Sequence, residues 1–200
     1  MSLTPNSLNN FKTVFKGGTR ANRFIVDSAF PAGVPVPSGL NPLQKGRISI
    51  ASASLPKSDV GVIGVPYRGR MAYYAGDRQY SVWPIKIYDD NDKLLWLMFQ
   101  RWKEALDGHL THNVQNNDFA YRTLKKNWFV NQTNLNGTGS TSSTTAGGTP
   151  GASIIRQIEL VNCWPSEVGG INFDLGSSDF VTFDVTLTFD YIKIVKGLGI

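Results

Sequence analysis

A chain of 200 residues, of which 41% are hydrophobic, can form one core of ordinary size, and we expect a single domain spanning residues 1–200. Its longest apolar run, Leu94 to Phe99, is far shorter than the roughly 20 residues that a membrane-spanning helix requires, so we expect no membrane segment. The net charge of +5 is scattered, with one adjacent basic pair at Lys125-Lys126, and predicts ordinary surface charge rather than a nucleic-acid-binding stripe.

Residues 1–20 are polar and lack the apolar stretch of a secretion signal. We expect them to form an extended N-terminal arm, on a protein that stays in the cytoplasm in which it is made. The single cysteine, Cys163, cannot form an internal disulfide, which agrees with a reducing compartment. Its neighbours predict a strand, in which we expect a buried and unreactive thiol.

Strand patterns recur through the first half of the chain: NRFIVD (22–27), GRISIASAS (46–54), YRGRMAYYAG (67–76) and QYSVWPIKIYDD (79–90). In the last of these, Trp83, Ile85 and Ile87 share one face, which we expect to be buried. Pro84 cannot donate a ladder hydrogen bond, so an edge or a bulge is expected there. Four prolines within residues 30–42 predict an extended connector without regular structure.

One helix is predicted within residues 89–108. Asp90, Asn91 or Asp92 can cap its start, and Gly108 suits its end. Apolar residues then recur at spacings of three or four and form one stripe: Leu94 or Leu95, Met98, Trp102 and Leu106. A helix of this kind covers an open end or a face of a sheet.

The second half begins with a tract of Gly, Ser, Thr and Asn at residues 131–152, which predicts a flexible inserted loop. Strand patterns resume at 153–165 and, after a turn at 166–170, at 171–175. From Thr182 to Tyr191 apolar and polar residues alternate without error, so this strand buries one face and exposes the other. The exposed face would carry Thr182, Asp184, Thr186, Thr188 and Asp190.

The candidates for chemistry have ordinary explanations. His109 and His112 could share a helical face as metal ligands, but Gly108 ends the helix before them, and we expect loop histidines. The acidic run from Asp89 to Asp92 lacks the glycine and the terminal glutamate of a calcium loop, so helix capping is favoured. The sequence therefore gives no reason to predict an enzyme, a cofactor or a metal site.

Aromatic and basic residues interleave at Tyr67 to Arg70 and at Tyr73-Tyr74. Proteins that bind single-stranded nucleic acid use such residues for stacking and for phosphate contacts. The same residues suit a β-sheet core or a large protein interface. Because no denser basic stripe accompanies them, we do not expect direct nucleic-acid binding.

Three stretches, in this order, resemble the tail tube proteins of contractile-tailed bacteriophages, the myovirus-type tail tube family. They are ASASLPKSDVGVIGVPYRGRMAYYAGDR (51–78), IELVNCWPSEVGGINFD (158–174) and TFDVTLTFDY (182–191). With NRFIVD and the predicted helix, the resemblance covers most of residues 20–192. Two segments depart from the family pattern, because the 131–152 tract is longer than the usual connection and the arm before Arg20 is extended.

The resemblance implies a mainly β subunit, a β-sandwich or barrel with one flanking α-helix, that forms hexameric rings. Stacked rings would form the inner tail tube, which conducts phage DNA and internal proteins into the host while the sheath contracts. The implied partners are further copies of the chain, the tail sheath protein, the baseplate and tail terminator proteins, and a tape measure protein in the lumen. DNA would pass without specific binding, and the protein would reside in the virion tail after assembly in the host cytoplasm. The alternatives are the tube of a related contractile injection machine and a cytoplasmic β-sandwich that binds a ligand.

A bore that conducts DNA must not hold it, so hydroxyl and acidic side chains suit its wall better than Lys or Arg. We therefore predict that one set of residues forms either the lumen wall or a face buried against the next subunit: Thr182, Asp184, Thr186, Thr188 and Asp190. The alternative is an outer face beneath the helix or the sheath.

Charge is divided unequally along the chain. The first 60 residues hold seven Lys or Arg against two Asp, whereas the last 40 hold two against five Asp or Glu. This asymmetry suits unlike surfaces that meet between stacked rings. The candidate donors are Arg20, Arg23, Lys45 and Arg47. The Ala-Gly-Asp-Arg corner could contribute an ion pair of Asp77 and Arg78 between subunits, or else a local turn with a surface pair.

Overall fold

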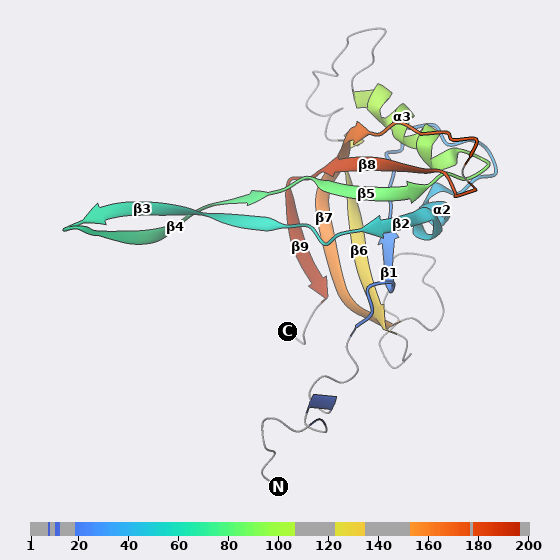
Figure 1. Ribbon diagram of the computed structural model, residues 1–200. Helices are drawn as coiled ribbons and strands as arrows, with labels where there is room; N and C mark the ends of the chain where they lie inside the picture. Colours follow the sequence, from blue (N-terminus) through green and yellow to red (C-terminus); the bar gives the residue numbers. More distant parts are fainter. Residues whose placement is uncertain are drawn as a thin grey trace.

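The computed structural model describes residues 8, 11–12, 19–106, 123–134, 153–176 and 178–196. The strands are β1 (Phe24–Asp27), β2 (Ile50–Ala53), β3 (Ser58–Tyr67), β4 (Arg70–Tyr80), β5 (Trp83–Tyr88), β6 (Lys126–Asn134), β7 (Ser153–Val168), β8 (Thr182–Thr188) and β9 (Tyr191–Lys196). The helices are α2 (Pro42–Ser49) and α3 (Leu94–Leu106), and within the described residues no helix has the length and hydropathy to cross a membrane. The mainly β architecture with a flanking helix confirms the predicted fold class (Figure 1).

The long strand β7 belongs to two sheets. Its first part pairs with β6 and with β9, which gives sheet A the order β1-β6-β7-β9. Its last part pairs with β8, which gives sheet B the order β7-β8-β5-β2. The change of partner occurs around Asn162, whose φ of 60° is left-handed. All pairings are antiparallel, and the shared strand brings the two sheets around one core.

The core is built from aromatic side chains of both sheets and of α3. Trp83 of β5, Trp102 of α3 and Trp128 of β6 are fully buried. Each indole N–H donates to a backbone carbonyl, that of Ser54, Leu124 and Ala29 respectively, at 2.6 to 2.9 Å. Burying a large apolar side chain contributes about 1.5–3 kcal/mol, and these hydrogen bonds avoid the penalty of an unpaired donor.

The helix stripe predicted from the sequence is confirmed. Leu94, Leu95, Met98 and Trp102 of α3 are buried, and Leu106 packs against the same cluster. The predicted cap is wrong, because the carbonyl of Lys93 accepts the first helical bond from Leu97 N at 3.1 Å, and Lys93 has a φ of 51°. The side chains of Asp90 and Asp92 instead bind Lys45.

Helix α2 occupies residues that the sequence predicted to begin a strand at 46–54. Asn41 caps it, since its Oδ1 accepts from the backbone N of Leu43 and of Gln44 at 3.1 and 3.3 Å, and Pro42 stands at the first helical position. Gly46 is required for packing, because a Cβ there would lie 2.2 Å from Ser28 Oγ. The alternation of apolar residues at 48–50 suggested a strand, but the local Asn-Pro cap decided the structure.

The predicted buried face of the 79–90 strand is confirmed in β5, where Trp83, Ile85 and Ile87 are all buried. Pro84 pairs with Thr186 of β8, whereas pairing with β2 begins only at Ile85. The strand thus has a local edge at Pro84, as a proline requires.

The predicted strand at 67–76 is confirmed from Arg70 onward, where it belongs to β4, but Arg68 and Gly69 form a hairpin turn. Their φ values of 47° and 80° are typical of a type I′ turn. The predicted strand at 171–175 is wrong, because these residues contain no strand. The turn expected at 166–170 begins later, since β7 continues to Val168.

The alternating run at 182–191 is two strands rather than one. β8 ends at Thr188, and β9 begins at Tyr191 and pairs with the other part of β7. The tract at 131–152 also begins differently, because residues 131–134 belong to β6; its remainder lies outside the described residues. Gly108, His109, His112 and most of the N-terminal arm lie outside them as well.

Candidate assembly surfaces

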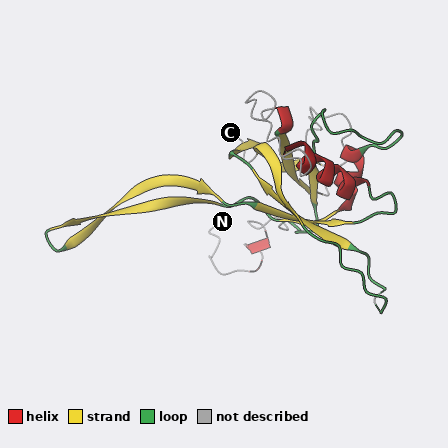
Figure 2. Cartoon of the chain, turned by 90° about the horizontal axis from the view of Figure 1, so that it is seen from above, coloured by secondary structure: helices red, strands yellow, loops and turns green. Residues whose placement is uncertain are grey.

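The β3–β4 hairpin projects as a two-stranded ribbon far beyond the rest of the molecule (Figure 2). Its register places apolar side chains on both faces of the ribbon, and all of the following are more than half exposed: Val62 and Tyr73 on one face, Ile63 and Tyr74 on the other. An isolated two-stranded ribbon is marginally stable in water. Because both faces are apolar, covering one face would leave the other in water, and the ribbon is suited to lie between other protein surfaces.

The polar face of β8 lies on the outside of sheet B. Its inward residues Phe183, Val185 and Leu187 are buried in the core that includes α3, whereas the side chain of Asp184 is 68% exposed. This face does not lie beneath α3, which packs on the opposite side of sheet B, whereas an outer face beneath the sheath stays a prediction. Thr182, Thr186 and Thr188 are half-buried on the outer side.

Asp184 faces a basic neighbour on this surface. Lys86 of β5 lies directly opposite it in the ladder, with Nζ 4.0 Å from Asp184 Oδ1. The outward residues of β5 and β8 thus carry one positive and one negative charge, and the exposed Glu167 of β7, opposite Thr186, adds a second negative charge to the face. A surface of small hydroxyl groups whose lysine is paired and whose remaining charge is acidic gives phosphates little to bind.

Asp190 does not belong to this face. It lies in the corner between β8 and β9, where its Oδ2 accepts from Asn162 Nδ2 at 2.7 Å and its Oδ1 lies 3.4 Å from Lys125 Nζ. Its backbone N–H donates to Val161 O at 3.0 Å, and Asn127 Oδ1 accepts from Asn162 N at 3.1 Å. These bonds connect the bend of β7 to the corner between β8 and β9. Asp190 therefore helps to position these three strands relative to one another within the subunit.

Lys45 and Arg47, predicted as donors between rings, have partners within the chain. Lys45 binds Asp90 and Asp92, which joins α2 to the start of α3. The hydrogen bonds that its ammonium group donates to Asp90 and then to Asp92 raise its pKa. Arg47 binds the buried carboxylate of Asp27 at 2.5 Å.

The remaining predicted charges are spread over the surface. Arg20 is exposed and Arg23 is half-buried, and neither forms an ion pair with another described residue. Asp77 and Arg78 are exposed residues inside β4, which excludes the local turn, and they form no ion pair within the described part of the chain. The predicted residues therefore lie in separate elements, with Lys45 and Arg47 in α2 and Asp77 and Arg78 in β4.

Sequence reasoning missed the connection between β7 and β8, residues 169–181. Phe173, Leu175 and Phe180 in it are almost fully exposed. Phe180 packs edge-on against Tyr88 at the end of β5, with ring centroids 6.3 Å apart. The sequence does contain a signal for this exposed segment. Its apolar residues follow neither a helical nor a strand period and stand among Gly, Ser and Asp.

Two kinds of chemical site are conceivable within the described residues, a reactive thiol and a metal site. Burial raises the pKa of the Cys163 thiol to about 12, so it remains protonated and unreactive near neutral pH. No group of three or more His, Cys, Asp or Glu within the described ranges could hold a metal ion.

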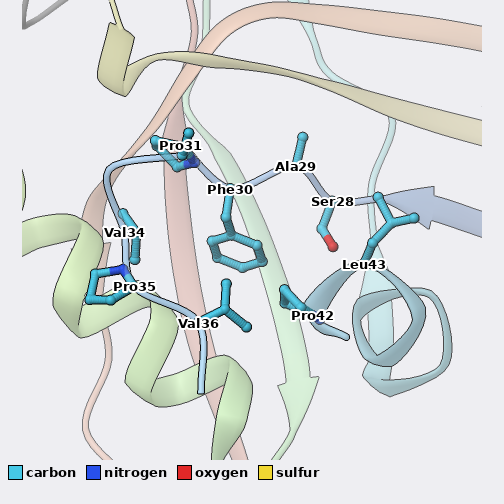
Figure 3. A pocket seen from close by; sticks show the side chains of 10 residues that line it. Ser28, Ala29, Phe30, Pro31, Val34, Pro35, Val36, Pro42 and Leu43 are labelled. Carbon is cyan, nitrogen blue, oxygen red and sulfur yellow. The ribbon is translucent and has the colours of Figure 1, made fainter. Parts of the chain in front are cut away.

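A cavity of about 420 Å³ opens beside α2 and is lined chiefly by Pro31, Pro35, Pro42, Val34, Val36 and Leu43 around Phe30 (Figure 3). Its lining contains no charged side chain, and the Ser28 hydroxyl beside it is buried without a hydrogen-bond partner.

Known proteins share this architecture. The family model for phage tail tube proteins matches residues 19–194. The tail tube protein gp19 of Enterobacteria phage T4 is 25% identical over 149 residues, which are 74% of this chain and 81% of that protein, and gp19 of phage T6 is 24% identical over the same shares.

Solved structures give the same fold at lower identity. The tube-terminating cap of the anti-feeding prophage has a TM-score of 0.59 at 17% identity and covers 90% of this chain and 91% of its own. A chain of the sheath–tube complex of the extracellular contractile injection system PVC has a TM-score of 0.55 at 14% identity and covers 96% of this chain and 99% of its own. Because the family match extends over most of its length, this chain belongs to the phage tail tube protein family.

Proposed function

We propose that residues 1–200 form one tube domain that assembles into hexameric rings, and that these rings stack into the inner tube of a contractile tail. Membership of the tail tube family supports the tube itself. The main support for self-assembly is the β3–β4 hairpin, because both of its faces are apolar and each needs to be covered by protein. Sheets A and B each contain four strands, with β7 belonging to both.

Sheet B lines the lumen in this proposal. Its outer face presents Thr182, Thr186 and Thr188 with the paired charges of Asp184 and Lys86, and Glu167 of β7 adds a carboxylate opposite Thr186. Such a wall lets DNA slide, since each unpaired Lys or Arg would add a phosphate contact that every ring repeats. Asp190 supports the wall from the corner and does not face the DNA.

The bore can be estimated from strand geometry. If six subunits each contribute four strands, 24 strands spaced about 4.8 Å apart and tilted by roughly 40° give a circumference of about 150 Å and a backbone diameter of about 48 Å. Side chains of about 5 Å at each wall leave roughly 38 Å, room for a DNA duplex and surrounding water.

The partners follow from this role. The outer side of the tube would contact the tail sheath protein, its ends would meet the baseplate and the tail terminator, and a tape measure protein would occupy the lumen before DNA does. The protein would assemble in the host cytoplasm, reside in the virion tail and act without catalysis or a cofactor.

Electron microscopy of the purified protein in negative stain tests the assembly. We expect rings or tubes roughly 80 to 100 Å wide, as a wall of two packed layers around the bore predicts. The double variant Val62→Asp and Tyr73→Asp should remain a folded monomer without tubes, since it makes one ribbon face polar and leaves the core untouched. Lys57→Gln, at the exposed base of the ribbon, is the matched control and should form tubes. A wild-type protein that stays a monomer at every concentration would refute the proposal.

A further inference from the structure

The loop between β7 and β8, residues 169–181, combines exposed apolar side chains with acidic charge. Phe173 and Phe180 are 80% and 86% exposed, and Leu175 is fully exposed. Asp174 and Asp179 are its only charged residues. So large an apolar area on so short a loop is unusual for a surface that stays in water, and it indicates a contact site.

The tip of the β3–β4 hairpin has the complementary composition. Residues 67–74 include Arg68 and Arg70 and no acidic residue. Tyr67, Tyr73 and Tyr74 are exposed around them, and the Arg68 guanidinium lies 5.4 Å from the centre of the Tyr67 ring. Arginine and tyrosine are the residues that contribute most to protein interfaces.

The hairpin and the loop emerge from opposite ends of sheet B. β5 and β8 are antiparallel, with Trp83 opposite Leu187 at one end and Tyr88 opposite Thr182 at the other. The hairpin leads into β5 just before Trp83, and the loop leads into β8 at Thr182. Figure 1 shows the hairpin pointing away from the end of β8 that the loop joins. A subunit therefore cannot place its hairpin tip on its own loop.

We propose that the β7–β8 loop of one subunit receives the hairpin tip of the next subunit. Arg68 and Arg70 then face Asp174 and Asp179, while the tyrosines pack on the exposed apolar side chains of the loop. The contact joins unlike surfaces, so each bound subunit offers a new loop and a new hairpin, and the chain of contacts propagates. This rests on the proposed function, because it assigns the surface that covers the hairpin within the tube.

The cavity beside α2 is a weaker candidate for the site that receives the hairpin tip. It is apolar and large enough for an aromatic side chain, but none of its lining residues is charged. It offers no acidic side chain to the two arginines at the hairpin tip, whereas the loop carries the acidic residues Asp174 and Asp179.

Cysteine cross-linking tests the contact directly. The natural thiol of Cys163 is buried and protonated, which keeps the background low. Assembled tubes of the double variant Tyr73→Cys and Phe173→Cys are treated with a short bis-maleimide and separated on a denaturing gel. We expect covalent dimers and longer chains. The matched control, Tyr73→Cys with Ile194→Cys, places the second thiol on an equally exposed position of β9 and should remain monomeric.

Charge exchange provides the second test. Arg68→Glu with Arg70→Glu, or Asp174→Lys with Asp179→Lys, should raise the protein concentration needed for tubes about tenfold, while the four changes together restore part of the loss. Thermal unfolding of each variant checks that the subunit still folds. If wild-type tubes form but neither cross-links nor charge exchange has an effect, or if the control pair cross-links instead, this contact is refuted and the tube proposal stands. Failure of the wild type to assemble refutes both.

Discussion

A change of charge on the outer face of sheet B provides the sharpest test of how the tube handles DNA. Asp184→Lys turns the neutral pair with Lys86 into two positive charges. The two native side chains are 49% and 68% exposed and 4.0 Å apart, so losing their attraction should reduce stability by only about 0–1 kcal/mol. The variant should therefore fold and assemble.

The effect on DNA should be much larger than the effect on folding. The charge rises by two per subunit, and so by about twelve per ring of six, at a wall that DNA passes closely. Each phosphate that becomes neutralised makes the slope of log affinity against log salt concentration more negative by about 0.9. Virions that carry the variant should release DNA more slowly at low salt than at high salt, and this difference should be absent in the wild type.

The measurement is the rate of DNA release after triggered contraction, followed by the fluorescence of a DNA-binding dye over a range of salt concentrations. Asp184→Asn should give an intermediate rate. The matched control is Glu159→Lys, which makes the same charge change on the outer face of sheet A, opposite Lys193 in the ladder. Slower release with Glu159→Lys and normal release with Asp184→Lys would show that sheet A lines the bore and would refute the reasoning.

Three further predictions concern the subunit. Asp27→Ala should lower the free energy of unfolding, measured in urea, by about 3–5 kcal/mol, because it removes the buried carboxylate that accepts from both Arg47 Nε and Asn131 Nδ2; an effect below about 1 kcal/mol would contradict this. Gly46→Ala should destabilise by about 1–3 kcal/mol through the clash with Ser28 Oγ, and adding Ser28→Ala should recover part of that loss in the same titration. Burial raises the pKa of Cys163 from 9.0 to about 12, so the stability that its protonated thiol contributes is complete below pH 9 and is lost as the pH rises toward 12; the melting temperature should fall less over this range in Cys163→Ala than in the wild type.

The parts of the fold that the sequence predicts well are those in which one periodicity decides burial. The alternation around Ile85 and Val185 and the helical stripe through Met98 each separate a buried from an exposed face, and the structure follows them. The family resemblance was also carried by local strand patterns, and the comparisons confirm it.

The errors occur where a single residue changes the path of the chain. The cap at Asn41 produces α2 where a strand was predicted to begin, and the left-handed backbone at Arg68 produces a turn at the start of another predicted strand. In the sequence, Asp190 continues the alternation of apolar and polar residues beyond β8. In the structure, its side chain accepts a hydrogen bond from Asn162 at the bend of β7, and β8 ends before it. The partners of Lys45 and Arg47 within the subunit could not be predicted for a related reason, since carboxylates distant in the sequence reach them only in the folded chain.

The sharing of β7 between the two sheets affects how the subunit responds to force. Two layers held only by side-chain packing can slide when one of them is pushed. Here a push on either layer also travels through the continuous covalent backbone of one strand, and the bonds of Asn162 and Asp190 resist any opening of the angle between the layers. A subunit built in this way moves as a rigid piece when it is driven forward from one side.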